Sequence, residues 1–150
     1  MASILPCMTE ARGSGVFAVS KTRRVLIVDD HVDSAELLAE VLSAQGHETR
    51  VAHEADEAER IALEFSPQVA ILDLRMPLTT GYELALRLRA HERLAECRLL
   101  ALTGLTERAD RALSEASGFE AHLTKPFDLR AVLAAVAAPP GAPRVRATAR

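Results

Sequence analysis

Short apolar runs alternate with stretches of helical periodicity along the middle of the chain. Uninterrupted apolar runs are expected in strands buried on both faces of a sheet, and they occur at residues 25–28, 69–72, 99–102 and, more weakly, 121–123. Residues 49–51 alternate between polar and apolar, which favours an edge strand. Apolar residues at helical spacing fill the intervening stretches, which predicts helices that pack by one face.

Five strands separated by helices predict an α/β fold, (βα)5, with a doubly wound five-stranded parallel sheet and helices on both faces. Gly46 and Gly118 follow predicted helices, where a residue in the left-handed conformation commonly ends the helix. Thr106 and Glu107 have the chemistry of a helix start. The pattern therefore predicts both the elements and their boundaries.

The length of 150 residues and the 49% hydrophobic content indicate one domain with a core of its own. That core is aliphatic, since the chain has no Trp, one Tyr and four Phe. We expect a flexible leader at residues 1–22, the folded domain at residues 23–138 and a disordered tail rich in Pro and Arg at residues 139–150.

Charge argues against a nucleic-acid-binding domain. Residues 23–138 hold 20 acidic and 13 basic residues, a net charge of −7, and no basic cluster. The chain has no apolar run long enough to cross a membrane, and the leader lacks the apolar core of a signal peptide. Cys7 and Cys97 make no disulfide framework, which favours a reducing, cytoplasmic setting.

Polar groups follow the predicted strands where each strand ends. Asp29 and Asp30 follow the first strand, Asp73 the third, Thr103 the fourth and Lys125 the fifth. The carboxyl ends of parallel strands share one edge of the sheet, where ligands bind in α/β folds, so we expect these groups to converge.

Three clustered carboxylates repel one another. Two like charges about 4 Å apart cost roughly 4 kcal/mol at an effective dielectric of about 20, so such a cluster needs cations or shifted pKa values. Lys125 supplies one cation. Mg²⁺ is the natural second, because it prefers oxygen ligands and keeps waters that a phosphate can replace. The residues therefore favour phosphoryl transfer to a carboxylate.

The same residues resemble a known family. Asp29-Asp30, Asp73 with its following Leu-Arg-Met-Pro, Gly81-Tyr82-Glu83-Leu84, Thr103-Gly104 and Lys125-Pro126-Phe127 are similar, in order and spacing, to the motifs of the receiver domain of two-component response regulators. The resemblance covers residues 23–138. It implies a flavodoxin-like fold with strand order 2-1-3-4-5.

The resemblance also implies a role for each matching residue. Asp73 is expected to accept a phosphoryl group, Lys125 to pair with the phosphoryl oxygens and Thr103 to donate its hydroxyl to them. The expected Mg²⁺ ligands are Asp29, Asp30, Asp73 and the backbone carbonyl of Arg75. The Lys125-Pro126 bond is expected to be cis.

Each residue also has a purely structural interpretation. The aspartates Asp29 and Asp30 suit helix caps, Thr103 suits a turn, and Lys125 before a proline suits a solvated loop. Their joint occurrence at matching spacings favours the functional interpretation.

Several positions depart from the family pattern. His122 stands where the family commonly has Tyr or Phe, and it is open whether it moves with Thr103, responds to pH or lies exposed. Neither Arg75 nor Leu105 is well suited to orient an attacking water, which predicts slow loss of the phosphate. Thr79-Thr80 replaces the more usual Met-Asp pair.

We therefore expect a stand-alone receiver, not an enzyme on a separate substrate, that catalyses only its own phosphorylation and dephosphorylation. Its expected partners are a histidine kinase or phosphotransfer protein and a downstream protein that binds residues 108–116, 121–123 and 129–136, with no nucleic acid, no membrane and a monomer or weak dimer. The alternatives are a phosphate shuttle or sink, part of a hybrid histidine kinase, or an unphosphorylated interaction module. A dehalogenase-type phosphatase is disfavoured because Arg75 stands where its second aspartate is required.

Overall fold

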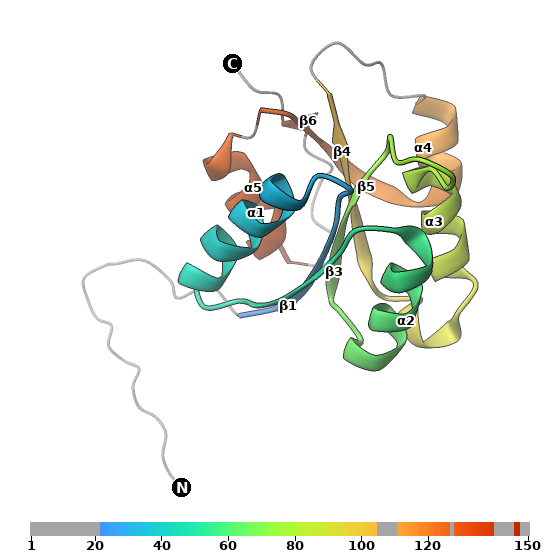
Figure 1. Ribbon diagram of the computed structural model, residues 1–150, viewed down its shortest axis with the longest axis horizontal. Helices are drawn as coiled ribbons and strands as arrows, with labels where there is room; N and C mark the ends of the chain where they lie inside the picture. Colours follow the sequence, from blue (N-terminus) through green and yellow to red (C-terminus); the bar gives the residue numbers. More distant parts are fainter. Residues whose placement is uncertain (1–21, 105–110, 127, 140–145, 148–150) are drawn as a thin grey trace, which may run out of the picture.

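The computed structural model describes residues 22–104, 111–126, 128–139 and 146–147, and it shows a parallel sheet between two layers of helices (Figure 1). The strands are β1 (Arg24–Val28), β2 (Glu48–Ala52), β3 (Val69–Asp73), β4 (Arg98–Thr103), β5 (Phe119–Thr124) and β6 (Arg146–Ala147). The helices are α1 (Val32–Ala44), α2 (Ala55–Phe65), α3 (Gly81–Arg89), α4 (Arg111–Ser117) and α5 (Leu129–Ala137), with a 3-10 turn, η2, at Glu92–Leu94.

The strand order is β2-β1-β3-β4-β5-β6, and every pairing is parallel. The predicted α/β fold and the order 2-1-3-4-5 are therefore confirmed for the five expected strands. The two-residue strand β6 beside β5 was not predicted, because it falls in the segment expected to be a disordered tail. The expectations for residues 1–21, 140–145 and 148–150 lie outside the described residues.

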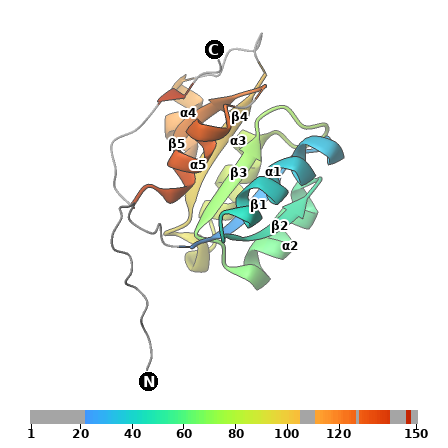
Figure 2. The same ribbon diagram turned by 90° about the vertical axis from the view of Figure 1, so that its left-hand side faces the viewer.

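Helices cover both faces of the sheet, α1 and α5 one face and α2, α3 and α4 the other (Figures 1 and 2). Alternate residues of the central strands feed two aliphatic cores. Leu26, Ala70 and Leu72 pack toward α2 and α3, while Val25, Ile27 and Ile71 pack toward α1 and α5. All of these residues are fully buried, which explains why the strands read as apolar runs without alternation.

The two outer predicted strands behave differently from the central ones. β2 lies at the sheet edge, as its alternating sequence predicted. β5 also alternates between buried and half-buried residues, so the expectation of a strand without alternation was wrong there. The register of β5 against β4 shifts between Leu99 and Leu100, leaving Glu120 as the extra residue between Phe119 and Ala121. Past this bulge, His122 pairs with Ala101.

Two glycines end helices as predicted. Gly46 after α1 has a φ of 97° and Gly118 after α4 has a φ of 89°, a region that residues with a Cβ rarely occupy. The sequence pattern predicts the first helix over Leu37–Ala44, but α1 begins five residues earlier, at Val32. The expected helix start at Thr106 lies outside the described residues. No helix within the described ranges is long and apolar enough to cross a membrane.

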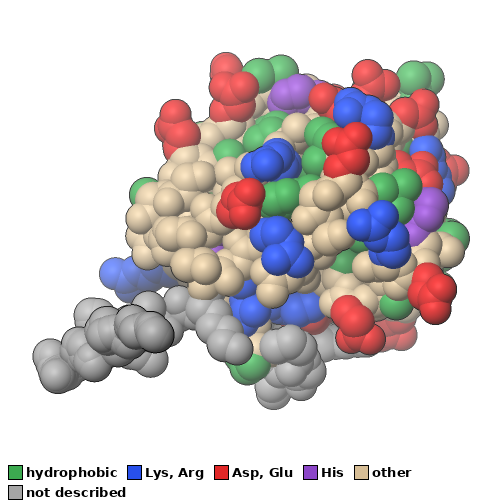
Figure 3. Space-filling view, turned by 90° about the horizontal axis from the view of Figure 1, so that it is seen from below, with side chains coloured by type: hydrophobic (Ala, Val, Ile, Leu, Met, Phe, Trp, Pro, Cys, Tyr) green, Lys and Arg blue, Asp and Glu red, His purple; other side chains and the backbone are tan. Residues whose placement is uncertain are grey.

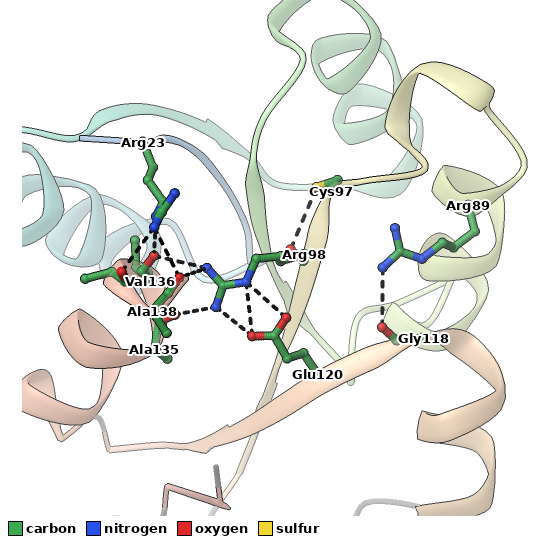
Figure 4. A network of polar contacts seen from close by, with 10 residues as sticks. Arg23, Arg89, Cys97, Arg98, Gly118, Glu120, Ala135, Val136 and Ala138 are labelled. Atoms are coloured by element: carbon green, nitrogen blue, oxygen red, sulfur yellow. Dashed lines mark hydrogen bonds and ion pairs between the residues drawn. The ribbon is translucent and has the colours of Figure 1, made fainter. Parts of the chain in front are cut away.

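Two buried arginines, Arg23 and Arg98, lie at the end of the sheet where the strands begin and contact neighbouring elements there (Figure 4). Arg98, at the start of β4, forms an ion pair with Glu120, with the Nη2 and Oε2 atoms 2.6 Å apart. Arg98 and Arg23 also donate hydrogen bonds to the last carbonyls of α5. The accepting residues are Ala135, Val136, Ala137 and Ala138. The arginines thus satisfy helix-end acceptors that have no partner within the helix.

We predict that Arg98→Met lowers the free energy of unfolding by about 3 kcal/mol, because it leaves a half-buried Glu120 and several carbonyls without their partner. Equilibrium urea unfolding measures this change. Glu48→Gln is the matched control, since it removes only the exposed Arg50–Glu48 pair at 3.6 Å and is expected to cost less than about 1 kcal/mol. Equal effects of the two substitutions would contradict the prediction.

Candidate functional site

The carboxyl end of the sheet carries the candidate site. Asp29 and Asp30 directly follow β1, Asp73 ends β3, Thr103 ends β4, and Lys125 directly follows β5. The structure therefore brings to one edge the residues that lie far apart in the sequence, as predicted from the parallel strands.

Lys125 is held between two carboxylates. Its Nζ atom lies 3.0 Å from Asp29 Oδ2 and 3.3 Å from Asp73 Oδ2. The side chain of Asp29 is fully buried and that of Asp73 is 5% exposed, whereas Lys125 retains 22% exposure. Lys125 is thus the single ammonium shared by a largely buried pair of carboxylates.

Backbone amides orient the remaining carboxylate oxygens. The amide of Arg75 donates to Asp73 Oδ1 at 3.0 Å, and the amide of His31 donates to Asp29 Oδ1 at 3.0 Å. Each contact spans two residues, so each aspartate is fixed by the loop that follows its own strand. Asp29 is not a side-chain cap for α1, whose N-cap is His31 without a capping side-chain bond.

Burial and the crowding of charges change the protonation of this site. Burial raises the pKa of Asp73 to about 6; the amide of Arg75 and the charge of Lys125 oppose the rise, while Asp29 adds to it. Burial by itself lowers the pKa of Lys125, but its contacts with Asp29 and Asp73 outweigh that effect and raise it. Lys125 therefore stays charged while Asp73 resists ionisation.

Two carboxylate oxygens of the site lack hydrogen bonds. Asp29 Oδ2 and Asp30 Oδ1 are buried and accept no hydrogen bond within the part of the chain that the structure describes, although Asp29 Oδ2 faces Lys125. A buried carboxylate oxygen without a hydrogen bond is costly, and a bound cation removes that cost. The oxygen-rich donor set fits a hard divalent cation such as Mg²⁺.

The other predicted site residues also lie at this edge. Thr103 is buried, and its backbone carbonyl accepts a 2.7 Å hydrogen bond from the amide of Lys125. The Lys125-Pro126 bond is cis, as predicted. Arg75 is exposed in the loop after Asp73, and Leu105 lies outside the described residues.

The start of α3 supports Asp73 in a way that the sequence analysis missed. A Cβ on Gly81 would lie 2.5 Å from the backbone oxygen of Asp73, so only glycine lets the helix approach this closely. Thr80 caps α3 in a reciprocal capping box with Glu83. The Thr-x-x-Glu spacing is the signal that predicts this cap, and it gives Thr80 a structural role.

His122 does not lie exposed at the strand end. It is half-buried on β5, and its Nε2 atom lies 2.8 Å from Oγ of Ser114, a buried residue of α4. Its ring centroid is 6.4 Å from that of Phe119. His122 therefore connects β5 to α4. Its pairing with Ala101 sets the side of the sheet on which its side chain lies.

A doubly wound parallel sheet with aspartates and a lysine at its carboxyl edge defines the class of CheY-like receiver folds. The chain belongs to the response regulator receiver domain family, whose model matches residues 25–137.

The chain is similar to two curated transcriptional regulators. It is 34% identical over 115 residues to the DNA-binding dual master transcriptional regulator RpaA of Synechocystis sp., covering 77% of this chain and 48% of that protein. It is 34% identical over 116 residues to the transcriptional regulatory protein GltR of Pseudomonas aeruginosa, with the same coverage of 77% and 48%. The chain thus spans about half the length of these relatives.

Solved receiver structures cover the same part of the chain. The chemotaxis protein CheY4 of Vibrio cholerae superposes with a TM-score of 0.72 at 27% identity, covering 77% of this chain and 97% of that one. The signal receiver domain of a histidine kinase from Syntrophus aciditrophicus superposes with a TM-score of 0.68 at 29% identity, covering 77% and 87%.

We predict that Asp73→Asn stabilises the metal-free protein by on the order of 2 kcal/mol at pH 7.5. The pKa of Asp73 is raised in the folded state, so the native protein holds a proton that the unfolded chain releases, and wild-type stability falls as pH rises from about 4 through 6. Asparagine does not ionise, so the advantage of the variant shrinks below that window.

Urea unfolding of both proteins across pH 4–8, with and without Mg²⁺, measures this difference. Mg²⁺ is expected to stabilise the wild type more than Asp73→Asn. A variant less stable than the wild type at pH 7.5 would contradict the predicted cost of ionising the buried Asp73 carboxyl.

Proposed function

We propose that this receiver domain accepts a phosphoryl group on Asp73, in a Mg²⁺-dependent reaction, from a histidine kinase or a phosphotransfer protein. The observation that carries the proposal is the position of Lys125, whose ammonium lies within 3.3 Å of both Asp73 and Asp29 at the ligand-binding edge of the sheet. A carboxylate flanked by a fixed cation suits a reaction in which negative charge gathers on the transferred group.

Asp29, Asp30, Asp73 and the backbone carbonyl of Arg75 are the groups that we propose to hold Mg²⁺. The buried oxygens of Asp29 and Asp30 that accept no hydrogen bond among the described residues support this assignment. Mg²⁺ held by these groups would supply positive charge that offsets the charge of the phosphoryl group.

The reaction forms an oxygen–phosphorus bond at Asp73 and breaks the phosphorus–nitrogen bond of the donor phosphohistidine, whose electron pair leaves with the imidazole. Lys125 pairs with a phosphoryl oxygen, and the Thr103 hydroxyl donates a hydrogen bond to another. Hydrolysis of the resulting acyl phosphate returns the carboxylate. The protein acts on its own side chain, so we do not propose an enzyme with a separate substrate.

The output surface in this proposal is formed by α4, β5 and α5, where a downstream protein binds. The contact between His122 and Ser114 supports it, because it joins β5, whose end carries Lys125, to α4. A phosphate shuttle or part of a hybrid kinase uses the same chemistry. An unphosphorylated interaction module does not use it, and the close charge pairing at Asp73 disfavours that alternative.

DNA binding is not carried over from the curated relatives. Their names describe whole regulators, and this chain matches only about half of their length. The net charge of −7 over residues 23–138 opposes binding to the phosphate backbone of DNA. Figure 3, which views the molecule from below Figure 1, shows basic and acidic side chains intermingled on that face, without a patch of one sign.

We predict that incubation with Mg²⁺ and a small phosphodonor such as acetyl phosphate adds one phosphoryl group to the chain, because the charges at Asp73 favour attack on phosphorus. Intact mass spectrometry detects the product, which acid preserves and base removes. Asp73→Asn is expected to abolish the product, and Lys125→Met to slow its formation by at least about 100-fold through loss of the fixed cation.

Glu83→Gln is the control, since it leaves the charges at Asp73 unchanged and alters only the cap of α3. Label that persists in Asp73→Asn would place the phosphate elsewhere. Failure of both a small donor and a partner kinase to label the wild type would favour the interaction module.

We predict slow dephosphorylation, with a half-life of many minutes rather than seconds, because Arg75 provides no carboxylate or amide to orient the attacking water. Decay of the phosphorylated mass after removal of the donor measures this rate. Arg75→Asn is expected to accelerate the decay several-fold, with Arg93→Asn as a control in the turn before β4. A half-life of seconds for the wild type would contradict the prediction.

A further inference from the structure

His31 lies beside the carboxylates of the candidate metal site. Its Nδ1 atom is 3.6 Å from Asp29 Oδ1 and 3.7 Å from Asp30 Oδ1. The side chain of Asp29 is fully buried, whereas that of His31 is 72% exposed. An exposed imidazole thus lies beside a carboxylate pair, at the N-cap of α1.

Four side chains offer ligand atoms close enough to share one ion. One atom each from Asp29, Asp30, His31 and Asp73 can be chosen so that all lie within 4.8 Å of one another. Two ligands that are each about 2.1 Å from a metal lie about 3.0 to 4.2 Å apart, depending on the angle between them. Closing these atoms around one ion requires rotation of the exposed His31 side chain and the half-buried Asp30 side chain.

The deepest carboxylate gives an independent reason to expect an ion. Asp29 has a fully buried side chain, and its Oδ2 atom accepts no hydrogen bond from any residue in the described ranges. Lys125 offsets part of the charge of Asp29, but the same ammonium also forms an ion pair with Asp73. The cluster therefore keeps an excess of negative charge, and the buried Oδ1 atom of Asp30 accepts no hydrogen bond among the described residues.

We propose that His31 joins Asp29, Asp30 and Asp73 to bind a divalent transition-metal ion such as Co²⁺, Ni²⁺ or Zn²⁺ through its Nδ1 atom. Imidazole nitrogen is a good ligand for these ions, whereas Mg²⁺ prefers oxygen ligands and keeps its waters. His31 thus gives the site a nitrogen ligand, which raises its affinity for these transition-metal ions and not for Mg²⁺.

The simpler role for His31 is an electrostatic contact with Asp29 and Asp30. Because the imidazole is largely exposed, such a contact contributes little, and its removal changes the binding of every divalent ion alike. Coordination by the imidazole instead changes transition-metal affinity selectively. The difference between the two metal classes therefore distinguishes the roles.

This inference deepens the proposed function, because a transition metal held by His31 would occupy the place of Mg²⁺ beside Asp73. Phosphorylation would then depend on which ion is bound. The binding itself requires no phosphoryl transfer, so metal titration tests the inference even if the proposed phosphorylation fails.

The test compares Co²⁺ and Mg²⁺ affinities of the full chain by calorimetry in the wild type, His31→Gln and His91→Gln. We expect His31→Gln to weaken Co²⁺ binding at least tenfold and to change Mg²⁺ affinity by no more than about twofold. Substitution of residues that only contact metal ligands already weakens metal binding by about tenfold or more. His91→Gln is the matched control, because His91 pairs with Glu59 outside the cluster. It is expected to change neither affinity.

A second readout uses the wild type alone. The visible absorption of bound Co²⁺ reports its ligands, and Zn²⁺ is expected to shift the imidazole resonances of His31 and not those of His91. Equal losses of Co²⁺ and Mg²⁺ affinity in His31→Gln would overturn the proposal in favour of the ion pair. Unchanged Co²⁺ affinity or unshifted His31 resonances would also overturn it.

Discussion

The charge balance around Lys125 is the constraint on which the site depends. One ammonium lies within 3.0 and 3.3 Å of two largely buried carboxylates, and Asp30 stands beside them with a buried oxygen that accepts no hydrogen bond within the described ranges. Burial is the main cause of the raised pKa of Asp73, Asp29 adds to the rise, and the single charge of Lys125 offsets it only in part. A site that is short of positive charge is suited to bind a cation and then an anionic group that the cation can share. The same shortage links stability, metal binding and the proposed chemistry.

The opposite end of the sheet keeps this geometry fixed. Arg98 holds Glu120 at the bulge of β5 and, together with Arg23, the carboxyl end of α5. Lys125 lies between β5 and α5, and both elements are thereby anchored to β4 and to the segment that enters β1. The bulge also sets which residues of β5 face α4, and it places His122 against Ser114. An ion pair remote from the site thus joins β4 to the bulge that lies between Phe119 and Ala121, on the same strand as His122.

Much of the fold and the main site residues were predictable, because they depend on local patterns. Buried parallel strands show uninterrupted apolar runs, and their carboxyl ends share one edge, so the convergence of Asp29, Asp73 and Lys125 follows from topology. The bulge at Glu120 and the arginine contacts were not predictable, since they join residues up to 115 positions apart and leave no periodic signal. The capping box of Thr80 and Glu83 did leave a signal, in the Thr-x-x-Glu spacing. Sequence could not show that His31 turns toward the carboxylates, because that depends on a side-chain rotation.

The contact between His122 and Ser114 has a consequence for signalling in the proposed function. Lys125 already contacts both Asp29 and Asp73, and a phosphoryl group on Asp73 adds further negative charge there. Either Lys125 moves toward the phosphoryl group, or the site binds a cation more tightly. The amide of Lys125 is bonded to the carbonyl of Thr103, and both residues stand at strand ends. In the proposed function a displacement of these residues would reach β5, and His122 on that strand is joined to α4 by one 2.8 Å hydrogen bond with Ser114. Because this bond ties the imidazole to Ser114, we expect His122 and α4 to move together and not independently.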